Sequence, residues 1–218
     1  RGKLPRERTL ELLRSVYAES SEDELLEMMN YIKKRKNEEM MGGTMSHGKR
    51  ENKNLARQAA TYLRKSDGPR VAVFEVGGFD THAAQGGVDG THTKCLVEMD
   101  EIINNLKDNL QEAYKDTIIL TVTEFGRTIK QNGGNGTEHG YGTAIFMAGG
   151  LLKKSQVHTD WPGLKRKEMY EGRDLNATID ARSVYASAMS TVFDLDFKRI
   201  QKDVFWGEDL QNLSDKLF

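Results

Sequence analysis

The sequence predicts an α/β protein with a mostly parallel sheet sandwiched between helices, and three observations support this prediction. Apolar runs of strand length occupy residues 71–76, 117–123 and 143–148, and a stretch with helical periodicity, residues 93–114, separates the first two. A strand–helix–strand order takes a right-handed crossover, which makes the two strands parallel. The uninterrupted apolar run at residues 118–120 is typical of a strand covered on both faces.

The first 66 residues are expected to form a helical N-terminal segment, followed by an α/β domain over residues 67–218, although a single domain over 1–218 also fits. Apolar spacing predicts helices over residues 1–18 and 21–36. The second of these begins with a capping box, Ser-Glu-Asp-Glu from Ser21.

A third helix is predicted over residues 52–65, and the turn residues 66–69 end it before the first strand. The loop between the second and third helices contains His47, which reads either as an exposed histidine or as a ligand.

The helix predicted between the first two strands has a buried stripe close to a period of 3.6 residues. Its members are Leu96, Met99, Ile102, Ile103, Leu106 and Leu110. The chain beyond Gly150 is rich in turn residues until a last helix, for which Asp180 is the expected N-cap.

Composition excludes several classes of function. Thirty-two basic and 33 acidic residues give a net charge of -1, which offers no overall field for nucleic acid. No apolar run approaches the roughly 20 residues of a membrane span. The single cysteine, Cys95, excludes an internal disulfide. The sequence given begins at Arg1 and not at Met, and we expect a further segment upstream; no signal-peptide pattern occurs within the residues given.

Carboxylates and imidazoles gather just past the predicted strand ends, where ligands bind in open α/β sheets. Asp80 and His82 point the same way if the chain is extended. Glu124 follows the second strand, and His139 follows a glycine-rich loop that can bring it back. Together they form an oxygen and nitrogen set suited to zinc, manganese or iron. The alternative is that the carboxylates cap helices or pair with Arg127 and that the histidines hydrogen-bond locally.

Arg127 lies three residues after Glu124 and has two interpretations. Its guanidinium is able to hold an oxyanion with two hydrogen bonds, or it forms an ion pair with Glu124 or Asp80. Thr81, Thr123 and Thr128 supply hydroxyl groups nearby, but the sequence shows no base that activates one of them.

Several motifs together resemble the bacterial family known as domain of unknown function 1501. They are Gly77-Gly78-Phe79-Asp80-Thr81-His82, Thr123-Glu124-Phe125-Gly126-Arg127-Thr128, Glu138-His139-Gly140, Met147-Ala148-Gly149-Gly150, Trp161-Pro162-Gly163-Leu164, Gly172-Arg173-Asp174-Leu175 and Asp180-Ala181-Arg182-Ser183-Val184-Tyr185-Ala186. The resemblance covers residues 55–195. It implies a place in the alkaline phosphatase and sulfatase superfamily, with a doubly wound α/β sandwich.

The resemblance also implies a metal-assisted site for phosphoryl or sulfuryl transfer. Its metal ligands would be Asp80, His82, Glu124 and His139, and Arg127 would steady the developing charge. Two departures stand out. Residues 1–50 show no strand pattern and no motif of the long N-terminal half that holds the superfamily nucleophile, so we expect that half to lie outside this sequence. In addition, Phe125 replaces one of the usual ligands.

These features lead to two hypotheses. In the first, the chain is the C-terminal portion of a metal-dependent hydrolase that acts on phosphate or sulfate esters of a small molecule or a polymer. This hypothesis includes no nucleic-acid or membrane partner, and the N-terminal half of the same protein or a second copy would complete the hydrolase. The resemblance implies that it is periplasmic or secreted. The second is a non-catalytic binding or structural module that keeps the fold.

Overall fold

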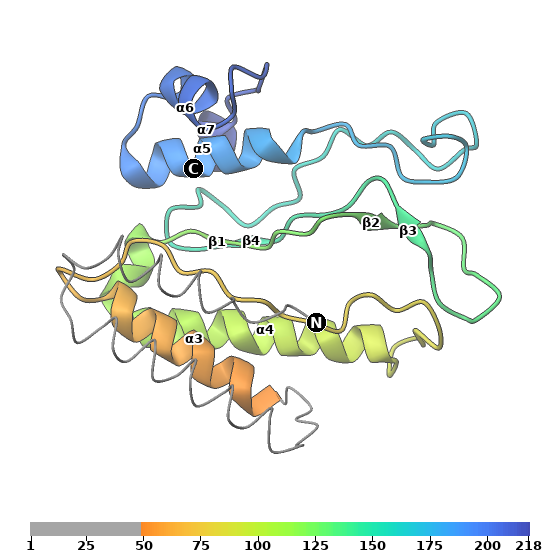
Figure 1. Ribbon diagram of the computed structural model, residues 1–218, viewed down its shortest axis with the longest axis horizontal. Coiled ribbons are helices and arrows are strands. Elements are labelled where there is room, and N and C mark those ends of the chain that lie inside the picture. The colour runs from red at the N-terminus through yellow and green to blue at the C-terminus, as the bar shows by residue number, and fades with distance from the viewer. Residues whose placement is uncertain (1–48) are drawn as a thin grey trace, which may run out of the picture. The chain divides into compact units, whose positions relative to one another are not determined.

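The structure is a computed structural model that describes residues 49–218, and these residues form one compact unit. Helices lie on both sides of a layer of extended segments (Figure 1). Its elements in chain order are α3 Lys49–Leu63, α4 Thr91–Leu110, the 3₁₀ helix η1 Gln111–Asp116, β1 Ile119–Leu120, β2 Gly126–Arg127, β3 His139–Gly140, β4 Met147–Ala148, α5 Ala181–Phe193, α6 Phe197–Asp203 and α7 Ser214–Leu217.

Helices α3 and α4 pack against each other and form the first core cluster. Ala56 and Ala60 of α3 have no exposed surface, and they lie against Ile102, Leu106 and Leu110 of α4. The two alanines are four residues apart, which places them on one face of the helix. The predicted third helix is therefore confirmed. Of the predicted stripe on the long helix, Ile102, Leu106 and Leu110 are buried, and Leu96, Met99 and Ile103 are half-buried.

This packing joins α3 to the same compact unit as the strands. The division into segments 1–66 and 67–218 and the single domain over 1–218 both stay predictions. The helices predicted within residues 1–36, and His47, lie outside the described residues.

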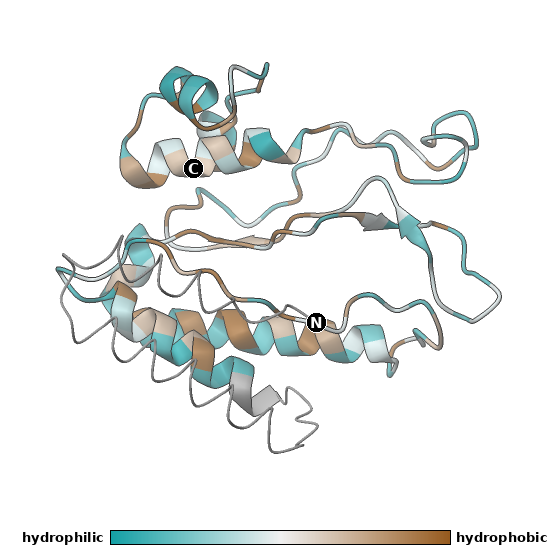
Figure 2. Cartoon of the chain, in the orientation of Figure 1, coloured by the Kyte–Doolittle hydropathy of each residue, from teal (hydrophilic) through white to brown (hydrophobic). Residues whose placement is uncertain are grey.

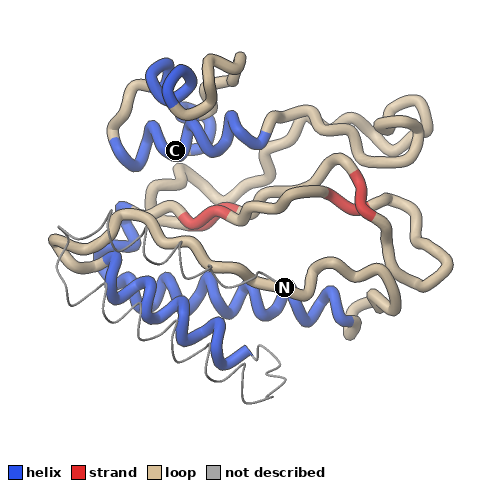
Figure 3. The backbone as a smooth tube through the Cα atoms, in the orientation of Figure 1, coloured by secondary structure: helices blue, strands red, loops and turns tan. Residues whose placement is uncertain are grey.

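The strands are short, and each pairs with one neighbour. Strand β1 pairs antiparallel with β4, and β2 pairs antiparallel with β3. Most of the chain between α4 and α5 is loop (Figure 3). No parallel pair occurs among residues 49–218. The mostly parallel, alkaline-phosphatase-like sheet therefore stays a prediction.

The predicted first strand, residues 71–76, is extended but is not a strand in the structure. Phe74 and Val76 pack on the α3–α4 cluster, while Val71 and Val73 are 62% and 91% exposed. The side chains alternate as in a strand, but within the described chain no neighbouring backbone hydrogen-bonds to this segment. Pairing requires such a neighbour, which the apolar pattern does not supply.

Strand β1 is covered on both faces, as its apolar run predicts. Ile119 packs on the α3–α4 cluster, and the next residue, Leu120, packs on a second cluster formed by Val184 of α5 with Leu213 and Leu217. Figure 2 shows hydrophobic residues on α4 and along the extended segments of this layer. Neighbouring residues of a strand point to opposite faces, so β1 connects the two helical layers.

Helices α5 and α6 enclose a third cluster, which contains Ala186, Phe197, Ile200 and Leu210. Asp180 caps α5 as predicted, because its carboxylate accepts a hydrogen bond from the backbone N–H of Arg182 at 2.8 Å. Within the part of the chain that the structure describes, no helix is long and apolar enough to cross a membrane.

Candidate metal centre

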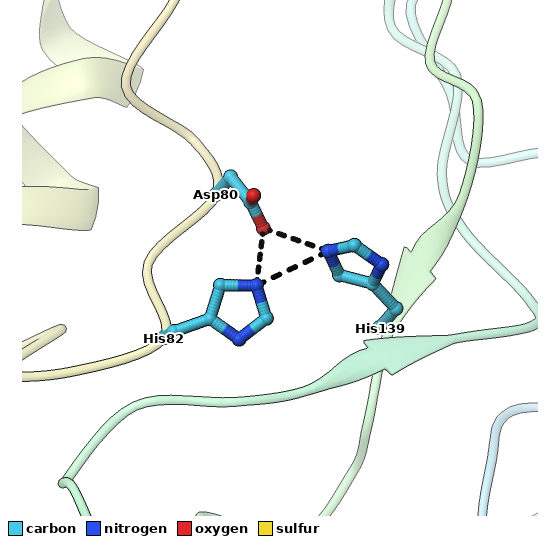
Figure 4. Close-up of side chains that lie close together, drawn as sticks. All are labelled: Asp80, His82 and His139. Carbon is cyan, nitrogen blue, oxygen red and sulfur yellow. Dashed lines mark hydrogen bonds and ion pairs between the residues drawn. The ribbon is translucent and has the colours of Figure 1, made fainter.

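Three of the four predicted ligands converge on one point (Figure 4). The Oδ1 atom of Asp80 lies 3.0 Å from Nε2 of His82 and 3.1 Å from Nε2 of His139, and the two nitrogens are 3.1 Å apart. All three side chains are about half exposed. We call these three residues the Asp-His-His cluster.

These three contacts cannot all be hydrogen bonds. An ionised carboxylate only accepts, and an imidazole Nε2 either carries one proton or accepts. If both Nε2 atoms carry protons, the two N–H groups point at each other and repel. If either Nε2 atom lacks its proton, its lone pair points at the negatively charged oxygen of Asp80. A shared cation removes this conflict, because all three atoms then act as electron-pair donors. Ligand atoms bound to one zinc ion at about 2.0 to 2.1 Å lie only a little more than about 3 Å apart, so the residues fit a metal ion.

The cluster is assembled by contact between two loops. The bridge between Ala83 and Asn135 and the hydrogen bond from Thr137 N to Thr81 O, at 3.1 Å, bind the loop after residue 79 to the β2–β3 connection. Gly136 makes this contact feasible, because a Cβ there would lie 2.3 Å from the carbonyl carbon of His82. A glycine is therefore required for the close approach.

Gly78 sets the direction of the chain just before Asp80. Its φ of +96° favours glycine, and a Cβ at this position would lie 2.9 Å from Sγ of Cys95. The Cys95 thiol donates to the carbonyl oxygen of Gly78 at 3.3 Å, which ties this turn to helix α4.

Arg127 lies beside the cluster and is paired with Asp80, which is one of the two roles that the sequence left open. Its Nη1 donates to Asp80 Oδ1, its Nη2 donates to the carbonyl of Thr137, and its Nε donates to Oγ1 of Thr137 at 3.0 Å. The guanidinium is thereby fixed against the carboxylate, and its remaining N–H groups are available to another acceptor.

Two side chains that sequence reasoning missed also contact the cluster. Glu138 Oε2 lies 3.1 Å from Nδ1 of His82, on the far side of the ring from the cluster. Phe125 stacks on His139, with ring centroids 3.8 Å apart and planes inclined by 19°. Phe125, which replaces a ligand in the resemblance, therefore supports the ring of a candidate ligand. Glu138 adjoins His139 in sequence, but only the loop contact reveals its partner.

Both carboxylates near the histidines have lowered pKa values. Partial desolvation raises the pKa of Asp80, but the hydrogen bonds from Arg127 and His139 and the charge of His82 lower it more. The hydrogen bond from Asn132 is the main cause that lowers the pKa of Glu138. Both groups are therefore ionised at neutral pH, which suits cation binding.

The remaining predicted residues lie elsewhere. Glu124 is exposed and is not part of the cluster. Each candidate hydroxyl donates to another group: Thr81 to Gln85 Oε1, Thr123 to the carbonyl of Phe125 and Thr128 to the carbonyl of Lys130. None of the three therefore faces the cluster as a nucleophile.

Comparison with known proteins identifies the family. Residues 5–202 match the model of the family described as "Protein of unknown function (DUF1501)". The chain belongs to this family. The match is wider than the motif region at 55–195 and extends into the N-terminal segment. No curated protein and no solved structure matches the chain.

Proposed function

We propose that this DUF1501 chain binds a divalent metal ion through Asp80, His82 and His139 and hydrolyses phosphate or sulfate esters. The observation that carries the proposal is the convergence of one carboxylate oxygen and two imidazole nitrogens within 3.1 Å of one another. A mixed oxygen and nitrogen set is suited to zinc, manganese or iron. When bound, the ion would supply Lewis acidity to the ester oxygen and a lowered pKa to a water molecule.

The residues around the cluster have defined tasks in this hydrolysis. Arg127 orients Asp80 and, through its remaining N–H groups, stabilises negative charge on the phosphate or sulfate oxygens. Water is the nucleophile, because the threonine hydroxyls donate elsewhere. The water oxygen bonds to phosphorus or sulfur, the ester bond breaks, and the alcohol leaves with a proton. The half-exposed cluster is open to a small molecule and to a polymer.

A non-catalytic binding module is the second candidate, and one observation favours it. Arg127 is already engaged by Asp80 and Thr137, so part of its capacity to hold an oxyanion is used within the protein. Such a module would bind the metal ion, or a ligand through the metal ion, without turnover.

The test combines metal content with hydrolysis. The wild-type chain and the His82→Ala, His139→Ala double variant are analysed by elemental mass spectrometry, and then assayed with p-nitrophenyl phosphate and p-nitrophenyl sulfate in added Zn²⁺ or Mn²⁺. His158→Ala is the matched control, because among residues 49–218 this exposed histidine hydrogen-bonds only to Gln156.

We expect near-stoichiometric metal and ester hydrolysis in the wild type and the control, and neither in the double variant. Metal without turnover would favour the binding module. Equal metal content in all three proteins would overturn the proposed site. Family resemblance further supports a periplasmic or secreted location, which fractionation of cells expressing the full-length protein tests.

A further inference from the structure

We infer that Glu138, held in place by Asn132, is a positioning residue that favours the tautomer of His82 with its proton on Nδ1, which leaves the cluster-facing Nε2 able to bind a metal ion. The inference rests on the proposed metal site and adds two residues to it. It starts from the two nitrogens of the His82 ring, which face different partners. Nε2 faces Asp80 and His139, and Nδ1 faces Glu138 at 3.1 Å.

Both nitrogens of the ring face a carboxylate, Asp80 at Nε2 and Glu138 at Nδ1, so in the metal-free protein the two carboxylates compete for the proton of a neutral imidazole. An ionised carboxylate can only accept, so the contact with Glu138 is a hydrogen bond only if Nδ1 donates. Glu138 therefore shifts the equilibrium toward the tautomer whose Nε2 carries a lone pair and can bind a metal ion. A carboxylate behind a metal-binding histidine is a common arrangement, and it fixes both tautomer and ring orientation.

Asn132 holds Glu138 and the loop together through all the hydrogen bonds that a side-chain amide can make. Its Oδ1 accepts from the backbone N–H groups of Gly134 and Gly136, both at 2.9 Å. Its Nδ2 donates to Oε1 of Glu138 and, at 2.8 Å, to the carbonyl oxygen of His82. The same amide therefore shapes the glycine-rich loop, fixes the backbone of His82 and orients the carboxylate behind its ring.

Because Asn132 donates to one oxygen of Glu138, the isosteric variant Glu138→Gln has a defined outcome. The amide oxygen of the new side chain stays with the Asn132 donor, and its NH₂ group turns toward Nδ1 of His82. Nδ1 must then accept, the proton moves to Nε2, and that proton points into the cluster. The variant therefore shifts the tautomer equilibrium toward protonated Nε2 with almost no change in shape.

Two readouts test the inference. The first is long-range ¹H–¹⁵N NMR of the metal-free protein labelled at histidine, with the His82 signals assigned from their loss in His82→Ala. The second is Zn²⁺ affinity, measured by competition with a chromogenic chelator. The matched control is Glu112→Gln, which makes the same change of charge at an exposed position of η1.

We expect a larger share of Nδ1-protonated His82 in the wild type and the control than in Glu138→Gln, in which the proton resides on Nε2. The Zn²⁺ affinity of Glu138→Gln should fall by about 10- to 100-fold, as is usual for loss of such a partner. The thermal midpoint of the metal-free protein should stay unchanged, because Glu138 is exposed.

Asn132→Asp separates the two tasks of Asn132. The new carboxylate still accepts from Gly134 and Gly136, but it cannot donate to Glu138 or to His82. We expect an intact loop by NMR with weakened Zn²⁺ binding. A Glu138→Gln variant with the wild-type tautomer equilibrium and the wild-type affinity would overturn the inference. If the wild type binds no metal, the proposed function fails, and the difference in tautomer between the metal-free wild type and metal-free Glu138→Gln still decides this inference by itself.

Discussion

Two groups of polar side chains in this molecule are arranged in opposite ways. Ser183 and Ser187 of α5 are 2% and 0% exposed, and each contact pairs a donor with an acceptor. Ser187 Oγ donates to the carbonyl of Ser183 at 2.7 Å and accepts from Leu213 N at 2.8 Å, and Ser183 Oγ accepts from Gln211 N. The Asp-His-His cluster is half exposed, and its three atoms cannot all be paired in this way.

The two groups differ in whether their polar atoms are paired within the protein, and this difference indicates which of them contributes to stability. A buried polar group without a partner costs free energy, and both buried serine hydroxyls, which fix the tail to α5, have hydrogen-bond partners. The half-exposed cluster keeps access to water, and Arg127, Glu138 and Phe125 contact it from outside. The serines therefore act within the fold, while in our proposal the cluster binds an ion from solution.

Adding a divalent cation is expected to have the largest effect, because it should stabilise the cluster and leave the serines unchanged. A metal ion that binds only the folded state at 1,000 times its dissociation constant stabilises it by about 4 kcal/mol. We expect Zn²⁺ or Mn²⁺ to raise the free energy of unfolding toward this value in urea titrations and a chelator to reverse the gain. Asp80→Asn should lose the gain, and Asp160→Asn, at an exposed position, should keep it. An equal gain in Asp80→Asn would place the ion elsewhere.

The buried serines should show the reverse behaviour. Ser187→Ala leaves the N–H of Leu213 buried without its acceptor, so we expect a loss of about 1 to 3 kcal/mol in the free energy of unfolding. Metal affinity should stay at the wild-type value, because the Ser187 hydroxyl bonds to Ser183 and Leu213 and not to the cluster. Urea denaturation and metal titration of the same sample measure both, with the exposed Ser155→Ala as control. A parallel loss of metal affinity would show that the two regions are coupled.

Asp180 provides a contrast with Asp80, because it is a carboxylate whose role is structural. It caps α5, so Asp180→Ala should lower the free energy of unfolding at neutral pH by about 0.5 to 2 kcal/mol. The hydrogen bond from the Arg182 side chain lowers its pKa in the folded state below the usual value of about 3.8. The stability contributed by the charge is therefore present above about pH 3.8 and is lost as the pH falls through the folded pKa.

The Asp180→Asn variant isolates this charge, because its amide oxygen can still accept from the backbone N–H of Arg182. The difference in unfolding free energy between wild type and Asp180→Asn should narrow as the pH is lowered below about 4. A difference that stays constant down to the acid transition would mean that the charge contributes nothing beyond the cap.

What the sequence could predict follows from the range of the interactions involved. Helix α4 was predictable because the spacing of Ile102, Leu106 and Leu110 is a local pattern. Burial of β1 on both faces was predictable because Ile119 and Leu120 are adjacent apolar residues. The state of residues 71–76 was not, because the same alternation of Phe74 and Val76 with exposed valines fits a paired strand and an unpaired extended segment.

The same distinction applies to the candidate site. Asp80, His82 and His139 could be proposed because each follows a predicted strand or belongs to a recognisable motif. The pairing of Glu138 with His82 joins residues 56 positions apart, and it depends on the contact between two loops. The stacking of Phe125 on His139 depends on the β2–β3 register, which no local pattern encodes.

Replacing Glu124 is expected to have the smallest effect on metal binding. At this residue the prediction from the sequence and the position in the structure differ most directly. The motif predicts a metal ligand, whereas the structure places this exposed carboxylate outside the cluster. Solvent and salt screen the charge of Glu124, which is exposed and is not a member of the cluster. Glu124→Gln should therefore change the Zn²⁺ affinity by less than about threefold. The measurement is the chelator competition used for Glu138→Gln, at two ionic strengths. A tenfold loss that persists in high salt would show that residues 121–125 move on metal binding and bring Glu124 to the ion, as the sequence predicts.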